Sequence, residues 1–126
     1  MKLSNLMIIK AIVCLMFGIP MILVPAILMS LFGVTLDSYG ILMARLYGAT
    51  LLGNLLLTWF SRSDPGSVAL RAAVLHLFIY DGLAFIVTLV AVVTGIMNAF
   101  GWSAVGIYLF FTVGYGYFQL VKPSTS

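Results

Sequence analysis

Long apolar stretches, separated by short polar interruptions, dominate this chain. Residues 11–36 and 82–121 carry no charged side chain. A helix that crosses a membrane needs about 20 mostly apolar residues to span about 30 Å of hydrocarbon. The second stretch is too long for one crossing, and it is interrupted near its middle by Asn98, Gly101 and Ser103. We therefore expect two helices in this stretch, joined by a short turn.

Two more segments lie between the uncharged stretches. They are apolar enough to cross a membrane, although they contain Arg45, His76 and Asp81. The pattern therefore predicts an all-α fold, a four-helix transmembrane bundle that forms a single domain over residues 1–126. The predicted helices lie near residues 5–30, 39–61, 68–95 and 103–121.

The predicted helix ends have local causes. Asp37 and Ser38 are residue types that cap a helix N-terminus, so they can start the second helix. Residues 63–67 read Ser-Asp-Pro-Gly-Ser, which favours a tight chain reversal and makes the second and third helices an antiparallel hairpin. Pro20 and Pro25 lie inside the first helix and should kink its far half, because proline has no N–H to donate. A membrane helix can tolerate such a kink when neighbouring groups satisfy the freed carbonyls.

The placement of Lys and Arg predicts the orientation. With four crossings, the N-terminus, the 62–67 turn and the C-terminus share one side, while the opposite loops carry only Asp37. Cytoplasmic loops are enriched in Lys and Arg, so both termini are expected in the cytoplasm. The first helix is expected to be retained, because its apolar run is too long for a signal peptide and no A-x-A-like site follows it. The basic residues on the shared side are Lys2, Lys10, Arg62, Arg71 and Lys122.

Composition supports a membrane location. The 126 residues are 63% hydrophobic and only 7% charged, with a mean hydropathy of +1.23. Soluble chains carry about 25% charged residues, so this composition excludes a soluble enzyme, a nucleic-acid-binding domain and a disordered tail. Cys14 is the single cysteine, which excludes an internal disulfide and a cysteine-only metal site. The expected environment is the lipid bilayer, as a multi-pass protein.

Four polar residues lie well inside the predicted crossings: Arg45, Asn54, His76 and Asp81. A charge near the bilayer centre costs at least about 2.5–3.5 kcal/mol, so each needs a partner or a wet cavity. Counted outward from the 63–67 turn, Arg45 is nearly level with Asp81, and Asn54 with His76. Arg45 and Asn54 point to opposite faces of their helix, so both pairs cannot share one contact line.

Small residues beside Arg45 and Asp81 favour these two as the pair in contact, because small residues let membrane helices approach closely. The pair could simply lock the hairpin, or it could bind a lipid headgroup, a quinone or a substrate carboxylate. Alternatively, Arg45 could extend to the headgroups and leave Asp81 alone. The flanking small residues are Gly40, Ala44 and Gly48, and Ala84, Thr88 and Ala91.

The remaining polar candidates predict no catalysis. A bis-histidine haem site at His76 would need a second copy to supply another histidine, so His76 is expected to be a polar packing residue with Asn54, or a ligand. Lys10 is expected to extend to the cytoplasmic headgroups. The chain contains no catalytic set and no metal-ligand cluster, so we expect no catalytic residue, no metal, no cofactor and no enzymatic activity.

Residues 112–116 read Thr-Val-Gly-Tyr-Gly, the signature of a potassium-channel filter. That filter is an extended segment followed by an inner helix, and the sequence to Ser126 is too short for such a helix. Tyr115, Tyr117 and Phe118 are instead typical of an aromatic belt at a membrane interface. We therefore interpret the match as a coincidence.

Several short motifs together resemble a family. Val24-Pro25-Ala26 and Leu31-Phe32-Gly33 are followed by Arg45-Leu46-Tyr47-Gly48-Ala49, then by Leu51-Leu52-Gly53 and Ser61-Arg62-Ser63-Asp64-Pro65. Over roughly residues 10–95 the chain resembles small bacterial four-helix membrane proteins akin to the DoxX-like group. The resemblance implies a protein of a bacterial inner membrane, with Arg45 and Gly48 as signature positions, and it implies no reaction or ligand.

Three functions remain open. The leading hypothesis is a structural or accessory subunit that packs against other membrane subunits or copies of itself. The second is a small-ligand binder or transporter that uses Arg45 and Asp81. The third is a quinone- or haem-linked redox subunit that uses His76 and Tyr80. No nucleic acid and no soluble-domain partner is expected.

Overall fold

The computed structural model describes residues 2–121, and every element in this range is helical. Residue 1 and residues 122–126 lie outside it, so the expected roles of Lys122 and of the C-terminus lie outside the described residues. The short η1 segment is π-helical and continues α5 without a break. The elements are α1 (Leu3–Leu23), α2 (Pro25–Ser30), α3 (Ser38–Ser61), α4 (Val68–Val93), α5 (Gly101–Gly116) and η1 (Tyr117–Val121).

Three of these helices, α1, α3 and α4, are long and apolar enough to cross a membrane. They contain 21, 24 and 26 residues, which exceeds the minimum for a crossing. The expected all-helical fold is therefore confirmed, and the three candidate crossings indicate a membrane protein. α5 by itself has 16 residues, fewer than the length of about 20 that a crossing needs.

The predicted helix starts are confirmed at two caps. The Asp37 carboxylate accepts a hydrogen bond from the Gly40 N–H at 2.7 Å and starts α3. The Ser67 hydroxyl accepts one from the Leu70 N–H at 3.0 Å and starts α4. Between them the chain reverses as predicted, with Gly66 at a φ of 77°, a conformation that glycine adopts without strain.

The first predicted helix is broken in two rather than kinked. Val24 lies between α1 and α2, and its N–H donates to the Pro20 carbonyl at 2.7 Å. Pro25 has no N–H, so it cannot continue the α1 hydrogen bonds, and it takes the first position of α2, where that loss costs nothing. Pro20 itself is accommodated inside α1.

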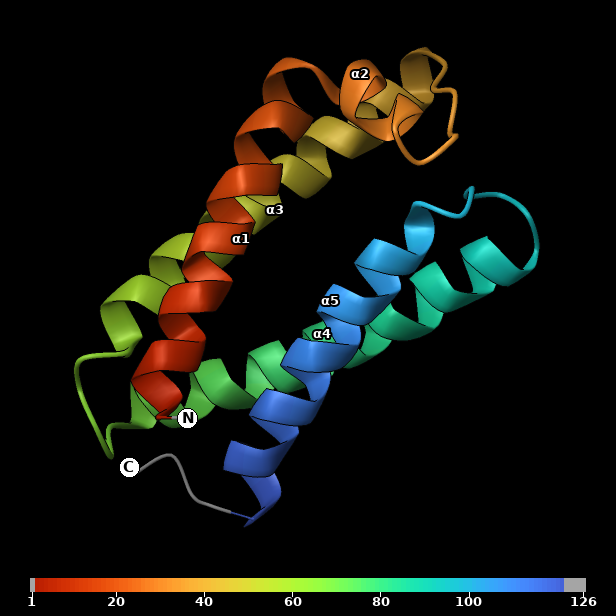
Figure 1. Cartoon of the computed structure of the whole chain (residues 1–126). Helices are drawn as coiled ribbons and strands as arrows, with labels where there is room; N and C mark the ends of the chain where they lie inside the picture. The colour runs from red at the N-terminus through yellow and green to blue at the C-terminus, as the bar shows by residue number, and fades with distance from the viewer. Residues whose placement is uncertain (1, 122–126) are drawn as a thin grey trace.

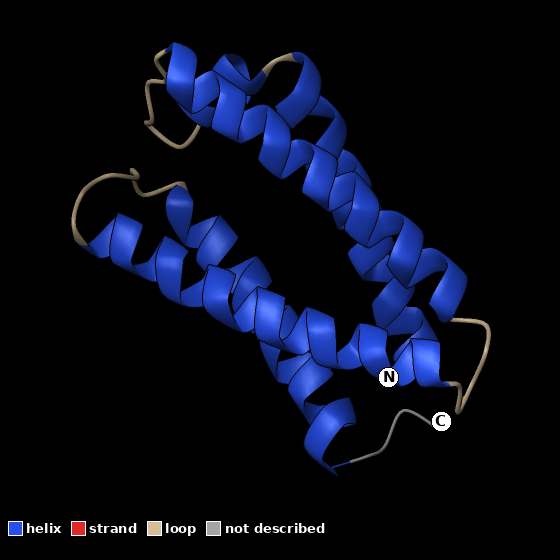
Figure 2. Cartoon of the chain, turned by 180° about the vertical axis from the view of Figure 1, so that it is seen from behind, coloured by secondary structure: helices blue, strands red, loops and turns tan. Residues whose placement is uncertain are grey.

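The helices form two antiparallel pairs (Figure 1). α1 packs along α3, α4 packs along α5, and contacts between the two pairs are few. The pairs meet at the end that holds the start of α1 and the α3–α4 turn, and they diverge toward α2 and the α4–α5 loop, as the view from behind also shows (Figure 2). We call these the closed end and the open end.

The hydrophobic core lies at the closed end. There α1, α4, α5 and η1 bury large side chains against one another. Tyr115, the tyrosine of the filter-like motif, is fully buried in this core, and residues 112–116 are α-helical rather than extended. The segment therefore differs from a channel filter, as the sequence predicted, but the aromatic belt expected at Tyr115 and Phe118 is wrong, because both side chains pack into the core. The core residues are Leu3, Leu6, Met7, Leu70, Ala73, Val74, Leu77, Phe111, Tyr115 and Phe118.

Candidate functional site

A cavity of about 640 Å³ lies between the two helix pairs, on the open-end side of the core. All five α-helices contribute to its wall, and nearly all the contributing side chains are apolar. Its volume falls within the range typical of small-molecule sites, which are mostly apolar with a few polar groups. This cavity is the candidate functional site.

Small residues make room for the cavity. Gly40 and Ala44 on α3 and Ala84 and Thr88 on α4 all line it. The sequence predicted that these residues would bring the two helices into close contact. Because the two helix pairs diverge here, the missing side-chain volume instead widens the space between α3 and α4.

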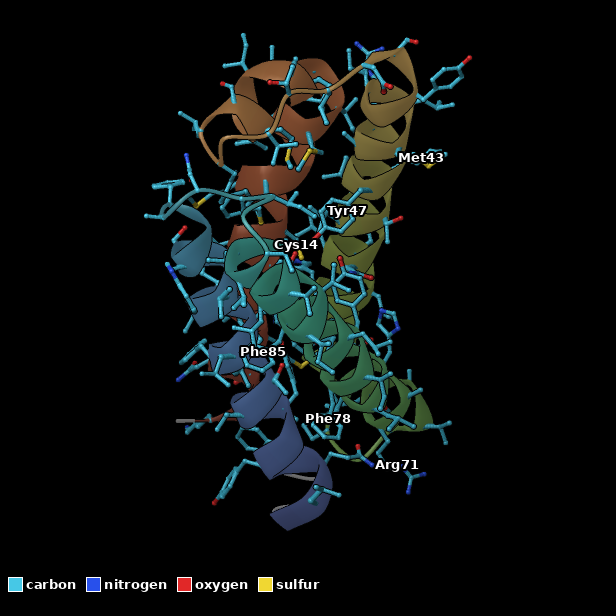
Figure 3. All side chains as sticks on the ribbon, turned by 90° about the vertical axis from the view of Figure 1, so that its right-hand side faces the viewer. Cys14, Met43, Tyr47, Arg71, Phe78 and Phe85 are labelled. Atoms are coloured by element: carbon cyan, nitrogen blue, oxygen red, sulfur yellow. The ribbon has the colours of Figure 1, made fainter. Side chains whose placement is uncertain are left out.

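The cavity opens sideways between α3 and α4. Met43, Leu83 and Val87 line it and are nevertheless 62%, 60% and 67% exposed, so they mark its mouth. Figure 3 shows α3 and α4 diverging toward the end that holds Met43, with Cys14 and Tyr47 between them. An opening with these side chains presents an apolar rim.

Contacts between the α2–α3 loop and the α4–α5 loop, which we call the clasp, cover the open end of the cavity. The Asn98 N–H donates to the Phe32 carbonyl at 2.9 Å, and the Asn98 side-chain amide donates to the Leu31 carbonyl at 3.2 Å. The Phe32 and Phe100 rings also pack together, with centroids 5.1 Å apart. Because this clasp joins the α2–α3 loop to the α4–α5 loop, the side mouth is the natural route of access.

An ion pair closes the inner end of the cavity, next to the core. Lys10 Nζ on α1 donates to Asp81 Oδ1 on α4 at 2.6 Å, and their side chains are 2% and 0% exposed. The ammonium group also lies near three aromatic rings, at 4.7 Å from the Phe111 centroid, 5.3 Å from Tyr80 and 5.8 Å from Tyr108. Lys10 is the only charged residue among the described residues that line the cavity.

Three tyrosines add hydroxyl groups beside the ion pair. Tyr47 and Tyr108 line the cavity from α3 and α5, and their hydroxyls are hydrogen-bonded to each other. Tyr80 lines it from α4, and its buried hydroxyl has no hydrogen-bond partner among the described residues. The inner end is therefore the polar end of an otherwise apolar cavity.

The expected ion pair between Arg45 and Asp81 is wrong, because Asp81 pairs with Lys10. Arg45 is exposed on α3, and its Nε donates to the Ile22 carbonyl at 3.1 Å. Counting residues outward from the 63–67 turn compares only α3 with α4. However, α3 packs along α1, so the side of α3 that carries Arg45 contacts the end of α1 instead.

Asn54 and His76, the other two residues that lie nearly level when counted outward from the turn, do form a pair. His76 Nε2 and Asn54 Oδ1 are 3.0 Å apart, which joins α4 to α3 by a hydrogen bond. Neither residue lines the cavity, and His76 is exposed on α4. Within residues 2–121 no group of three or more His, Cys, Asp or Glu side chains is arranged to hold a metal ion.

The role expected for Lys10 was also wrong. Its side chain does not extend to a headgroup region but is buried between α1 and α4. One sequence signal was available, since Lys10 lies on the same helical stripe of α1 as Leu3, Met7 and Cys14, which are all buried. Nearly every residue of α1 is apolar, so this stripe does not stand out in the sequence.

No family model, no curated protein and no solved structure matches this chain. The resemblance to the DoxX-like group therefore stays a prediction that rests on the short motifs alone.

Proposed function

We propose that this chain is a membrane protein that binds a lipid-soluble small molecule within the bilayer. The observation that carries the proposal is the apolar cavity with its side mouth between α3 and α4. An exposed apolar rim at Met43, Leu83 and Val87 favours entry from hydrocarbon rather than from water.

The packing of the closed end favours binding over transport. Beyond the Lys10–Asp81 pair the space between the helices is filled by the core, including the buried rings of Phe111 and Tyr115. Core side chains at native density leave no path for a small molecule. A molecule that enters the cavity would therefore leave by the same mouth.

The proposal includes four membrane crossings, the fourth being the continuous helical rod from Gly101 to Val121. Its described residues carry no charge, and its length reaches that of a crossing. Lys2, Arg62 and Arg71 lie on or near the closed end, which favours a cytoplasmic closed end, in a bacterial inner membrane. Lys10 no longer counts toward this argument because it is buried.

Single cysteines test this topology. In a Cys14→Ala background, Ser63→Cys in the α3–α4 turn and Thr35→Cys in the α2–α3 loop are both exposed positions. A membrane-impermeant maleimide should label Ser63→Cys only from the cytoplasmic side and Thr35→Cys only from the opposite side. Labelling of both positions from one side would show that α3 does not cross the membrane and would contradict the proposed topology.

A cavity-filling substitution tests the binding function. Ala84→Phe places a ring in the cavity, whereas Ala72→Phe places the same ring on an exposed position of the same helix. The chain and both variants would be purified in mild detergent, and the bound apolar molecules would be extracted and quantified by mass spectrometry. We expect Ala84→Phe to lose molecules that the original chain and Ala72→Phe retain. Equal content in all three would contradict the proposal.

A binding protein of this kind can work alone or as an accessory subunit that associates with other membrane subunits or with itself. Those partners stay predictions. A redox role for His76 has less support, because His76 is not among the residues that line the cavity.

A further inference from the structure

The charges at the inner end of the cavity are balanced. The Lys10 ammonium and the Asp81 carboxylate are in direct contact at 2.6 Å, and both are almost fully buried. The faces of three aromatic rings surround the ammonium and add to its stabilisation. The inner end therefore carries no net charge toward the cavity.

This balance disfavours a charged ligand. An anion placed beside Lys10 would compete with Asp81 for the ammonium and leave the carboxylate buried without its counter-charge. A cation would compete with Lys10 for the carboxylate in the same way. Leaving a charge unpaired in an apolar interior costs several kcal/mol, far more than a single new contact returns.

An uncharged oxygen, in contrast, has partners at this end. Each tyrosine hydroxyl can donate one hydrogen bond and accept two. The Tyr80 hydroxyl has no partner among the described residues, and the Tyr47 and Tyr108 hydroxyls retain accepting capacity beyond the bond that they share. The rest of the cavity wall offers almost only apolar side chains.

From these observations we infer that the ligand is an uncharged apolar molecule with a hydroxyl or carbonyl oxygen at one end. Its oxygen sits at the tyrosine hydroxyls, and its apolar body extends toward the mouth at Met43 and Val87. The Lys10–Asp81 pair selects against ligands whose headgroup is charged. This inference rests on the proposed binding function and specifies its ligand class.

Four probes with matched alkyl chains test the inference: dodecanol, methyl dodecanoate, dodecanoate above its pKa, and dodecylamine. The Kd of each is measured on the full chain in mild detergent by native mass spectrometry. We expect dodecanol and methyl dodecanoate to bind more than about tenfold more tightly than the two charged probes. Dodecanoate or dodecylamine binding as tightly as dodecanol would overturn the inference.

Two variants change the charge balance in opposite directions. Asp81→Asn leaves the Lys10 ammonium without its counter-charge and should raise the affinity for dodecanoate by at least about tenfold. Lys10→Met leaves the carboxylate alone and should shift the preference toward dodecylamine. An unchanged preference in a folded variant would contradict the inference, and the probe series on the original chain decides it if the variants do not fold.

The same measurements separate this inference from the proposed function. If the uncharged probes bind and Ala84→Phe removes that binding while Ala72→Phe does not, the cavity is a binding site, whatever the charged probes do. If no probe binds, or Ala84→Phe binds the probes as well as Ala72→Phe does, both the binding function and the ligand class are overturned.

Discussion

Arg45 Nε donates a hydrogen bond to the carbonyl oxygen of Ile22, 3.1 Å away, at the place where α1 ends. In an unbroken helix this carbonyl would accept a hydrogen bond from the Ala26 N–H, four residues later. However, α1 ends at Leu23 and Pro25 starts a new helix, so this bond is not available. A charged side chain from α3 therefore supplies the donor that the break removes. This contact explains why an arginine is tolerated on an apolar helix although no carboxylate within residues 2–121 pairs with it.

Replacing Arg45 with Met should destabilise the protein by about 1–3 kcal/mol, because the Ile22 carbonyl loses its donor in apolar surroundings. The free energy of unfolding would be measured by denaturant titration in detergent. Arg71→Met is the matched control, since Arg71 is exposed on the first turn of α4. Equal stability of the two variants would show that the Arg45 contact contributes nothing.

Gly48 and Gly53 on α3 should respond to alanine with opposite signs. A Cβ at Gly48 would lie 2.9 Å from the Gly18 carbonyl oxygen on α1, whereas a Cβ at Gly53 would meet no atom of the described residues within 4 Å beyond its own stretch of helix. Gly48→Ala should therefore force α1 and α3 apart and cost about 1–3 kcal/mol. Gly53→Ala should stabilise the helix by up to about 1 kcal/mol. The same unfolding titration measures both, and a stabilising Gly48→Ala would refute the close crossing.

The Lys10–Asp81 pair should be far more sensitive to the loss of one partner than to the loss of both. Asp81→Leu leaves a buried ammonium alone and should cost about 3–5 kcal/mol, whereas Lys10→Met together with Asp81→Leu should cost much less. Unfolding free energies of the single and double variants decide the matter. A double variant that loses as much as the two single variants combined would mean that the two side chains do not interact.

A double-mutant cycle on Asn54 and His76 should give a coupling energy of about 0.6 kcal/mol, typical of interhelical hydrogen bonds in membranes. The variants are Asn54→Leu, His76→Leu and their combination. A parallel cycle on Arg45 and Asp81 is the control, because these residues bond to different partners and should be additive. Coupling in the control cycle and none in the first would restore the pairing expected from the sequence.

The starts of α3 and α4 were predictable because local chemistry sets them, whereas at Pro25 the sequence predicted a kink and the structure has a break between α1 and α2. Asp37 and Ser67 satisfy N–H groups of their own helices, and Pro25 removes a donor within its own turn, so none of these effects depends on the rest of the fold. It was likewise predictable that Asn54 and His76 lie at the same depth, because the tight turn between α3 and α4 fixes the depth of residues counted outward from it.

The candidate site was only partly predictable. Asp81 was identified from its cost in an apolar segment, but its partner was assigned to Arg45 rather than to Lys10. The cavity itself left no signal, because Ala44 and Ala84 are equally compatible with close helix contact and with open space. Which of the two occurs depends on the angle between the helix pairs.

The sequence by itself determined where the helices run and that they are suited to lipid, because capping, proline geometry and apolar length act within a segment. Only the tertiary structure decided which faces meet. In helices that are apolar all round, hydrophobicity does not distinguish the face toward lipid from the face toward a neighbour. The pairing of α1 with α3 and of α4 with α5, and with it the cavity and its ion pair, follows instead from side-chain packing across the whole molecule.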